Sequence, residues 1–223
     1  MQGSTKKVVA GSALALASAG MIASMAGGTA TAAGSASQAV VGGTDTRARL
    51  VPLNNSGVFG VAHVNVDGRD LDINVNARGL LRGMPHAQHI HFGARAAHEC
   101  PDVRLDENKD HRLNTAEGLP DYGPVRVSLT TRGATGKGST LAVNRFPTAD
   151  NGRINYERRT TTGPRVAEGI GAGDAVVVIH GIDYNHNGKY DFRGAGKSEL
   201  DPALPAEATD PVSCGVLRTQ DLP

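Results

Sequence analysis

The chain has 223 residues, with 23 basic side chains against 22 acidic ones and a formal net charge of +1 at pH 7. This near-neutral balance argues against nucleic acid or an anionic membrane surface as the main partner. There is no tryptophan, and aromatic residues make up only 4% of the chain. A core must therefore be built largely from Val, Ile, Leu and Ala, and the length suits a single domain.

The N-terminus has the pattern of a secretory signal peptide. Lys6 and Lys7 precede an apolar stretch of small residues, and Ala30-Thr31-Ala32 fits a signal-peptidase site. The stretch is rich in Gly, Ser and Ala rather than Leu and Ile, which favours cleavage over an uncleaved anchor helix. We expect a signal peptide over residues 1–32, a flexible lead-in over 33–47 and one domain over 48–223. The predicted product is secreted, with no stable membrane insertion.

Short runs of alternating apolar and polar residues point to β-strands. In one run Leu71, Ile73 and Val75 alternate with polar residues, the period of a half-buried strand. By such signals we expect strands near 58–66, 71–77, 125–129, 139–145, 153–159, 175–180 and 214–217. No apolar period of 3.6 residues persists after the leader. The sequence therefore predicts an all-β fold, a Greek-key sandwich or flattened barrel.

Two histidines in one strand and a third in another can meet at one metal ion. His89 and His91 are two residues apart, and side chains at that spacing point to the same face of a strand. His180 closes the apolar run 176–179 of a second strand. Three imidazoles are a common set of ligands for a transition metal, and copper heads the affinity order for such donors. A fourth ligand would come from a loop histidine: His98, His111 or His186.

Three histidines with an open position also describe catalytic zinc, which lowers the pKa of bound water to about 7. No proton shuttle or hydrophobic wall is evident near these histidines, so we favour copper and consider zinc unlikely. We expect His86, which follows Pro85, to hydrogen-bond a loop carbonyl. We expect His63 to be an ordinary side chain of the first strand.

The chain has two cysteines, Cys100 and Cys214. In an exported chain, a single pair is most simply one disulfide. Closing a loop of this length would stabilise the fold by about 4–5 kcal/mol on the chain-entropy model.

Two acidic segments look like calcium-binding loops. The first, residues 106–117, has oxygen ligands at loop positions 1, 3, 5, 9 and 12, as an EF-hand does: Asp106, Asn108, Asp110, Asn114 and Glu117. It departs from the pattern at position 6, where His111 replaces glycine. The second repeats D-x-N-x-N-G-x-x-D with Asp183, Asn185, Asn187 and Asp191. Position 12 of the second loop is Gly194, although Glu199 could reach in. Asx-rich turns that need no ion are the alternative.

Three segments of the chain resemble the copper/zinc superoxide dismutases. The run Gly79-Leu80-x-x-Gly83-x-x-His86-x-x-His89-Ile90-His91 is similar to their copper-ligand strand, 177–180 to their later copper-ligand strand, and 213–217 to their C-terminal disulfide strand. The likeness implies a copper ion on His89, His91 and His180. It also implies the family disulfide at the two cysteines and superoxide, or another small anion, as the substrate.

The chain departs from that family where its chemistry matters. Asp106 stands where the family has a histidine that bridges copper and zinc, and Pro211 stands where it has the arginine that guides the anion to copper. The family's cluster of zinc ligands is not recognisable. We therefore expect copper binding with weak or absent superoxide dismutation.

A second resemblance is to the CHRD domain, a β module of unknown biochemical activity. It rests on His89-Ile90-His91-x-Gly93 followed by 123–129. It implies an alternative function, a non-catalytic binding or structural module stabilised by calcium and one disulfide. A metal carrier is a third alternative. No serine-nucleophile elbow, CxxC pair or phosphate-binding loop is evident, and the sequence does not identify a partner protein.

Overall fold

The computed structural model describes residues 43–220, so the predicted signal peptide lies outside the described residues. The strands are β1 (Thr44–Pro52), β2 (Phe59–Asp67), β3 (Asp70–Arg78), β4 (Gln88–His91), β5 (Val125–Ser128), β6 (Arg153–Thr161), β7 (Val176–His180), β8 (Pro211–Val216) and β9 (Arg218–Thr219). The helices are α1 (Thr115–Tyr122), α2 (Pro164–Gly171), α3 (Phe192–Ala195) and α4 (Ala206–Thr209), with 3-10 turns at Val103–Leu105, Lys137–Ser139 and Val143–Arg145. Strands therefore make up most of the regular secondary structure in the described part of the chain.

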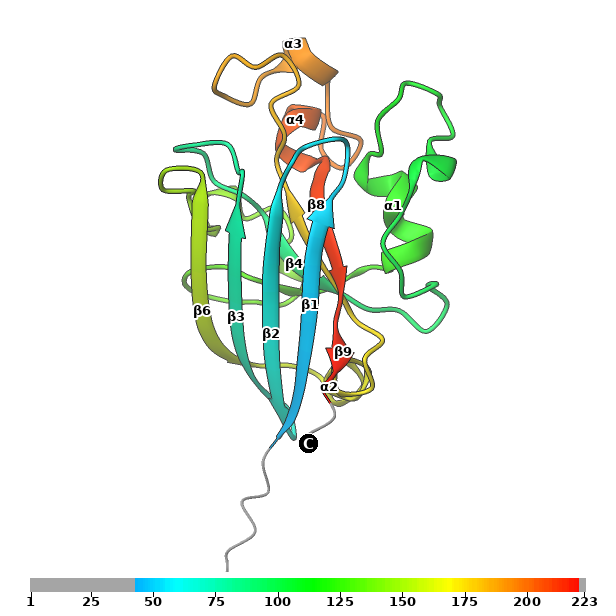
Figure 1. Cartoon of the computed structure of the whole chain (residues 1–223), viewed down its shortest axis with the longest axis vertical. Helices are drawn as coiled ribbons and strands as arrows, with labels where there is room; N and C mark the ends of the chain where they lie inside the picture. Colours follow the sequence, from blue (N-terminus) through cyan, green and yellow to red (C-terminus); the bar gives the residue numbers. More distant parts are fainter. Residues whose placement is uncertain (1–42, 221–223) are drawn as a thin grey trace, which may run out of the picture. The chain divides into compact units, whose positions relative to one another are not determined.

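The strands form one curled antiparallel sheet in the order β5-β4-β7-β8-β1-β2-β3-β6, and β9 pairs with β1 (Figure 1). Strands β1, β2 and β3 follow one another as a meander, and β6 adds to its far side. The segment between β6 and β7 contains α2 and returns the chain to the other half of the sheet. The predicted all-β sandwich or barrel is confirmed.

The main core lies against the inner face of this sheet. In β3, Leu71, Ile73 and Val75 are buried, while the residues between them are partly exposed. Fully burying an aliphatic side chain contributes about 1.5–3 kcal/mol. The alternation that the sequence predicted for this strand is therefore what holds it on the core.

β4 and β7 are buried on both faces, unlike β3. Ile90, Val177 and Ile179 point inward to the main core. On the outer face, Val178 belongs to a second hydrophobic cluster that includes Tyr122 of α1. The insertion between β4 and β5, which contains α1, supplies this outer layer, and the polar residues that it covers are consequently removed from water.

The disulfide anchors that insertion. Cys100, which lies in the insertion, is bonded to Cys214 of β8 with an S–S distance of 2.06 Å. The predicted pairing is confirmed. Because the bond joins residues 114 positions apart, it fixes the insertion to the centre of the sheet rather than to its own neighbours.

Three expectations about elements need correction. Residues 139–145 form 3-10 turns rather than a strand, because Arg145 donates from its guanidinium to the carbonyls of Arg132 and Ala134 and holds the segment as a compact loop. β1 begins at Thr44, within the predicted lead-in, because the Thr46 hydroxyl is buried and donates to the Val64 carbonyl. The helices α1 and α2 were not expected, and each is too short for an apolar period to stand out.

Among residues 43–220, no helix has the length and apolar character needed to cross a bilayer.

Candidate metal centre

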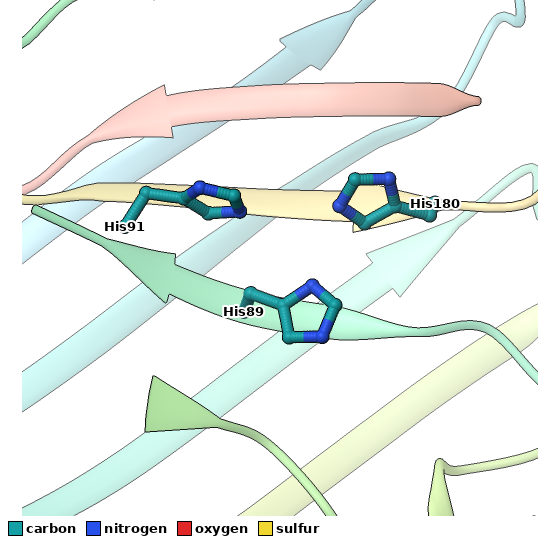
Figure 2. Close-up of side chains that lie close together, drawn as sticks. All are labelled: His89, His91 and His180. Atoms are coloured by element: carbon teal, nitrogen blue, oxygen red, sulfur yellow. The ribbon is translucent and has the colours of Figure 1, made fainter. Parts of the chain in front are cut away.

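The three predicted histidines meet on the outer face of β4 and β7. His89 and His91 project from β4, and His180 ends β7, which pairs with β4 through His89 and Val178. One ring nitrogen from each histidine lies within 4.8 Å of the other two (Figure 2). An ion bound to imidazole at about 2.0–2.1 Å allows two of its ligand atoms to lie up to about 4.2 Å apart. The cluster therefore needs only a small contraction to hold one ion.

The cluster is almost fully removed from water. The exposed fractions of His89, His91 and His180 are 3%, 1% and 3%. The ring of Tyr122 in α1 lies 4.5 Å from that of His91, and the ring of Phe146 lies 5.2 Å from that of His89, measured between centroids. These two aromatic rings form part of the cover over the site.

Each imidazole is held by a backbone carbonyl from a loop or a helix end. His89 Nε2 lies 3.1 Å from the Thr140 oxygen, His91 Nδ1 lies 2.7 Å from the Gly123 oxygen, and His180 Nδ1 lies 2.6 Å from the Thr209 oxygen. A carbonyl oxygen only accepts, so each of these nitrogens must carry the proton and donate. This bond fixes the tautomer and the ring orientation, as outer partners of metal-binding histidines commonly do.

The second nitrogen of each ring is left as a free lone pair. His89 Nδ1, His91 Nε2 and His180 Nε2 are buried without a hydrogen-bond partner. A buried polar atom without a partner costs about 1–3 kcal/mol. A single cation bound by all three would satisfy them together, so the residues present fit a metal ion.

Burial also keeps the three rings neutral. It lowers the pKa of His91 to about 3 and that of His180 to about 4. The pKa of His89 falls well below its ordinary value, first because of burial and then because a charged His180 or His91 would repel a second positive charge. Neutral imidazole is the form that binds metals, so at neutral pH no proton has to leave before an ion enters.

His86 is not a member of the cluster, and its ring contacts backbone carbonyls beside it. Its Nδ1 lies 2.9 Å from the carbonyl oxygen of His180, and its Nε2 lies 3.3 Å from that of Leu81. The hydroxyl of Tyr190 is 3.2 Å from both ring nitrogens. The predicted contact with a loop carbonyl is present, and His86 and Tyr190 together link the end of β7 to the second acidic loop.

The structure does not bring the proposed fourth ligands to the cluster. His98 Nε2 lies 2.8 Å from the Gly93 carbonyl oxygen, and its Nδ1 lies 3.7 Å from an Asp174 oxygen. His111 and His186 are exposed in the two acidic loops. Within the described chain, the group of histidines and acids that converges as a metal site contains His89, His91 and His180 alone. These three side chains leave any further coordination position to a non-protein ligand.

In the first acidic loop, the carboxylates accept hydrogen bonds from the backbone. Asp106 accepts from the amides of Asp110 and His111, and Asp110 pairs with Arg112 at 2.5 Å. Asn114 and Glu117 form a capping box at the start of α1. These contacts are Asx turns and a helix cap that stand without an ion. Calcium binding by this loop remains a prediction.

The second acidic loop is organised by a buried acid that sequence reasoning missed. Glu207 is fully buried and accepts hydrogen bonds from the amides of Tyr184 at 2.9 Å and Asp191 at 2.7 Å. A Cβ at Gly194 would collide with the Glu207 carboxylate, so glycine is needed there. Glu199, the acid expected to reach in, accepts instead from the Thr115 amide at the start of α1.

The other four residues named for the second loop are also held by hydrogen bonds within the loop. Asp183 accepts from the amides of Asn187 and Gly188, Asn185 donates to Asp191, and Asp191 caps α3. No signal in the sequence marks Glu207 as their neighbour, because it lies beyond α3. Calcium binding by this loop likewise remains a prediction.

A second buried acid, Asp210, ties the two acidic loops together. Its Oδ2 accepts from Arg112 of the first loop at 2.8 Å and from the Tyr184 hydroxyl of the second at 2.9 Å, and Oδ1 has no hydrogen-bond partner. Burial raises the pKa of Asp210 to about 7, against the lowering effect of Tyr184 and Arg112. Asp210 follows Thr209, whose carbonyl holds His180, so the network adjoins the histidine cluster.

Comparison with protein-family models gives no match, and comparison with curated proteins gives none either. The resemblances to superoxide dismutases and to the CHRD domain therefore stay expectations. The function has to be argued from the histidine cluster itself.

Proposed function

We propose that this chain is an exported copper-binding protein that holds one copper ion through His89, His91 and His180. The observation that carries the proposal is the set of three buried lone pairs, each on a neutral ring whose other nitrogen is fixed to a carbonyl. Three pre-oriented nitrogen donors without a carboxylate or thiolate suit copper, which also binds such donors more tightly than the other common divalent ions.

When bound, copper would supply one-electron redox chemistry. The chain's own part is to hold the ion and to keep water away. The carbonyls of Thr140, Gly123 and Thr209 keep the protons on the nitrogens remote from the ion. Tyr122 and Phe146 cover two of the three rings. A desolvated site of neutral ligands favours retention of the ion over fast exchange with solvent.

The primary test is metal stoichiometry. Native protein loaded with copper and freed of excess should retain about one ion per chain, as expected for one three-histidine site. His89→Ala combined with His91→Ala should retain none, and circular dichroism should still report β structure. His63→Ala, which removes an exposed histidine from β2, is the control and should retain the native amount. Unchanged copper in the double variant would refute the site.

We further propose that superoxide dismutation is weak. Asp106 and Pro211 replace the family's bridging histidine and guiding arginine, and the ligand rings are at most 3% exposed. A cationic cleft can raise the encounter rate of an anion by about 10–10³, and that contribution is lost here. Copper-loaded protein should be only slightly more active than the copper-free form. A rate near the diffusional ceiling of about 10⁸–10⁹ M⁻¹s⁻¹ would contradict this.

A non-catalytic CHRD-like module is the alternative function. The disulfide between the insertion and β8 favours it, because this bond stabilises the outer layer without any ion. Protein isolated from an oxidising compartment would then contain no stoichiometric copper and would show no superoxide-dependent chemistry when loaded. A copper content of about one ion per chain in the isolated native protein would decide for the copper-binding proposal, because a CHRD-like module would hold no copper.

A further inference from the structure

A groove rich in arginine lies on the outer face of the other half of the sheet. The face is formed by β1, β2, β3 and β6, and the groove at one end of it has a volume of about 750 Å³. Arg47 and Arg49 of β1, Arg78 of β3 and Arg153 of β6 line it, and no acidic residue does. Within residues 43–220 none of these four arginines forms an ion pair, so their charge is not neutralised by the protein.

The strand register places like charges directly opposite one another in this groove. Arg78 faces Arg153 across β3 and β6, and both arginines line the groove. Like charges at directly opposed positions destabilise a sheet. The fold therefore has a repulsive pair at this end of the face, and within residues 43–220 neither arginine forms an ion pair that would offset it.

The same two strands handle charge differently at the other end. There Asp72 of β3 faces Arg159 of β6, and the two side chains form an ion pair at 2.9 Å. The strand pair thus accommodates opposite charges where the residues allow it. Repulsion that the fold does not require is often found where a site serves a ligand.

We propose that this groove binds an acidic polysaccharide, a chain of sugars that carries carboxylates. The planar guanidinium groups of arginine suit carboxylates, which they can bind through two parallel hydrogen bonds. Asn76 and Asn155 face each other between the arginines and offer amide donors and acceptors for hydroxyl groups. Phe59, which is 41% exposed, offers a flat apolar surface to the face of a sugar ring.

The spacing of the arginines indicates a ligand with several acidic groups. β1 and β6 are separated by three inter-strand steps in the sheet order, which corresponds to about 14 Å at about 4.8 Å per step. At this spacing, arginines on the two strands can contact two different carboxylates at once. An extended chain with repeated carboxylates can contact them in turn.

The composition of the face argues against a second copy of the protein as the occupant. Charged residues are depleted at the centre of protein interfaces, whereas arginines line this groove on three strands. A ligand recognised by charge alone, such as polyphosphate, would leave the asparagine pair and Phe59 without a role. Both alternatives are outcomes of the experiment below.

Binding of oligogalacturonate, a chain of uronic acids, tests the proposal by calorimetry, with neutral dextran oligomers and inorganic polyphosphate as comparisons. Native protein should bind oligogalacturonate, should not bind dextran, and should lose affinity as salt rises, because exposed charges are screened. Arg78→Ser with Arg153→Ser should weaken binding by about tenfold or more, since each hydrogen bond to a charged group is worth about 1.5–3 kcal/mol.

The matched control is Arg165→Ser with Arg193→Ser, which removes the same charge outside the groove. It should bind oligogalacturonate as the native protein does. Equal loss in both double variants would show attraction by net charge alone and would overturn the proposal. Binding of polyphosphate without oligogalacturonate, or self-association that the groove variants abolish, would also overturn it.

Arg153→Glu separates binding from folding. It places an acid directly opposite Arg78, so the melting temperature should rise while oligogalacturonate binding is lost. A variant that melts at a higher temperature and still binds with native affinity would refute the site. Because the groove lies away from β4 and β7, these results do not depend on whether the histidine cluster holds copper.

Discussion

At the residue scale, the decisive feature is which buried polar atoms have a hydrogen-bond partner and which have none. In the histidine cluster each ring has one nitrogen bonded to a carbonyl and one left free. At Asp210 one carboxylate oxygen accepts two hydrogen bonds and the other accepts none. Unpartnered buried atoms cost stability, and at the histidines a cation would remove that cost. At Asp210 protonation would remove part of it.

Asp210 should make the fold less stable as pH rises towards neutrality. Burial raises its pKa to about 7, although Arg112 and the Tyr184 hydroxyl act against this and Glu199 acts with it. The folded state therefore binds the proton more tightly than the unfolded state. This contribution is complete below the unfolded pKa, near 3.8, and is lost as pH rises through about 7, with a slope of at most about 1.4 kcal/mol per pH unit.

Asp210→Asn tests this by removing the titrating group while keeping the shape. The free energy of unfolding, measured in urea, should fall more between pH 5 and pH 8 for the native protein than for the variant. Parallel pH profiles for the two proteins would mean that Asp210 is ionised throughout this range.

At the scale of elements, the insertion between β4 and β5 is what makes the histidine cluster a buried site. α1 within it places Tyr122 against His91, and its capping box is formed by Asn114 and Glu117. Two of the residues predicted as calcium ligands thus already have a structural role at the start of α1. An ion would have to add to these contacts or replace some of them.

Calcium should nevertheless stabilise the protein if the first loop binds it. A ligand present at 100 times its dissociation constant raises stability by about 2.7 kcal/mol. The melting temperature of copper-free protein should be higher in excess calcium than in a calcium chelator. Asp106→Asn should remove the difference, whereas Asp67→Asn, at the end of β2, should keep it. Identical melting temperatures in calcium and chelator for the native protein would leave the loop as an Asx-rich turn.

At the scale of the whole molecule, the fold is one sheet whose two halves differ in what lies on their outer faces. The half with β4 and β7 is covered on its outer face and holds the histidines. The half with β1, β2, β3 and β6 exposes its outer face and carries the arginine groove. The disulfide attaches the covering layer to β8, which lies between these halves in the sheet order.

Removing the disulfide should weaken both the fold and the metal site. Cys100→Ser with Cys214→Ser opens a loop whose ends are 114 residues apart, which should cost up to about 4–5 kcal/mol on the chain-entropy model. Because the insertion covers the cluster, copper should also dissociate faster from this variant. Unfolding in denaturant and transfer of copper to a chelator measure the two effects. Native rates of copper transfer would show that the cover does not depend on the bond.

The sequence was sufficient where short-range periodicity determines structure. The alternation in β3 and the spacing of His89 and His91 each follow from the two-residue period of a strand, and His180 was marked by the apolar run before it. The cover and supports of the site were not predictable in this way. Tyr122, Glu207 and Asp210 reach their partners only through the tertiary fold.

The errors have the same origin. The strand expected at 139–145 looked apolar enough locally, but contacts made by Arg145 determine its conformation. The predicted lead-in was too long because Thr44 and Thr46 resemble linker residues in the sequence. Their place in a strand depends on pairing with β2. Loop histidines such as His98 cannot be ranked as ligands from sequence, because their orientation depends on neighbours such as Gly93 and Asp174.

The central claim is that one copper ion is held by specific nitrogens of three histidines. A crystal structure of the copper-loaded protein, with diffraction data collected on both sides of the copper absorption edge, tests it most directly. We predict one anomalous peak within bonding distance of His89 Nδ1, His91 Nε2 and His180 Nε2, with the opposite nitrogens still bonded to the carbonyls of Thr140, Gly123 and Thr209. Copper bound elsewhere with these three rings unchanged would contradict the account.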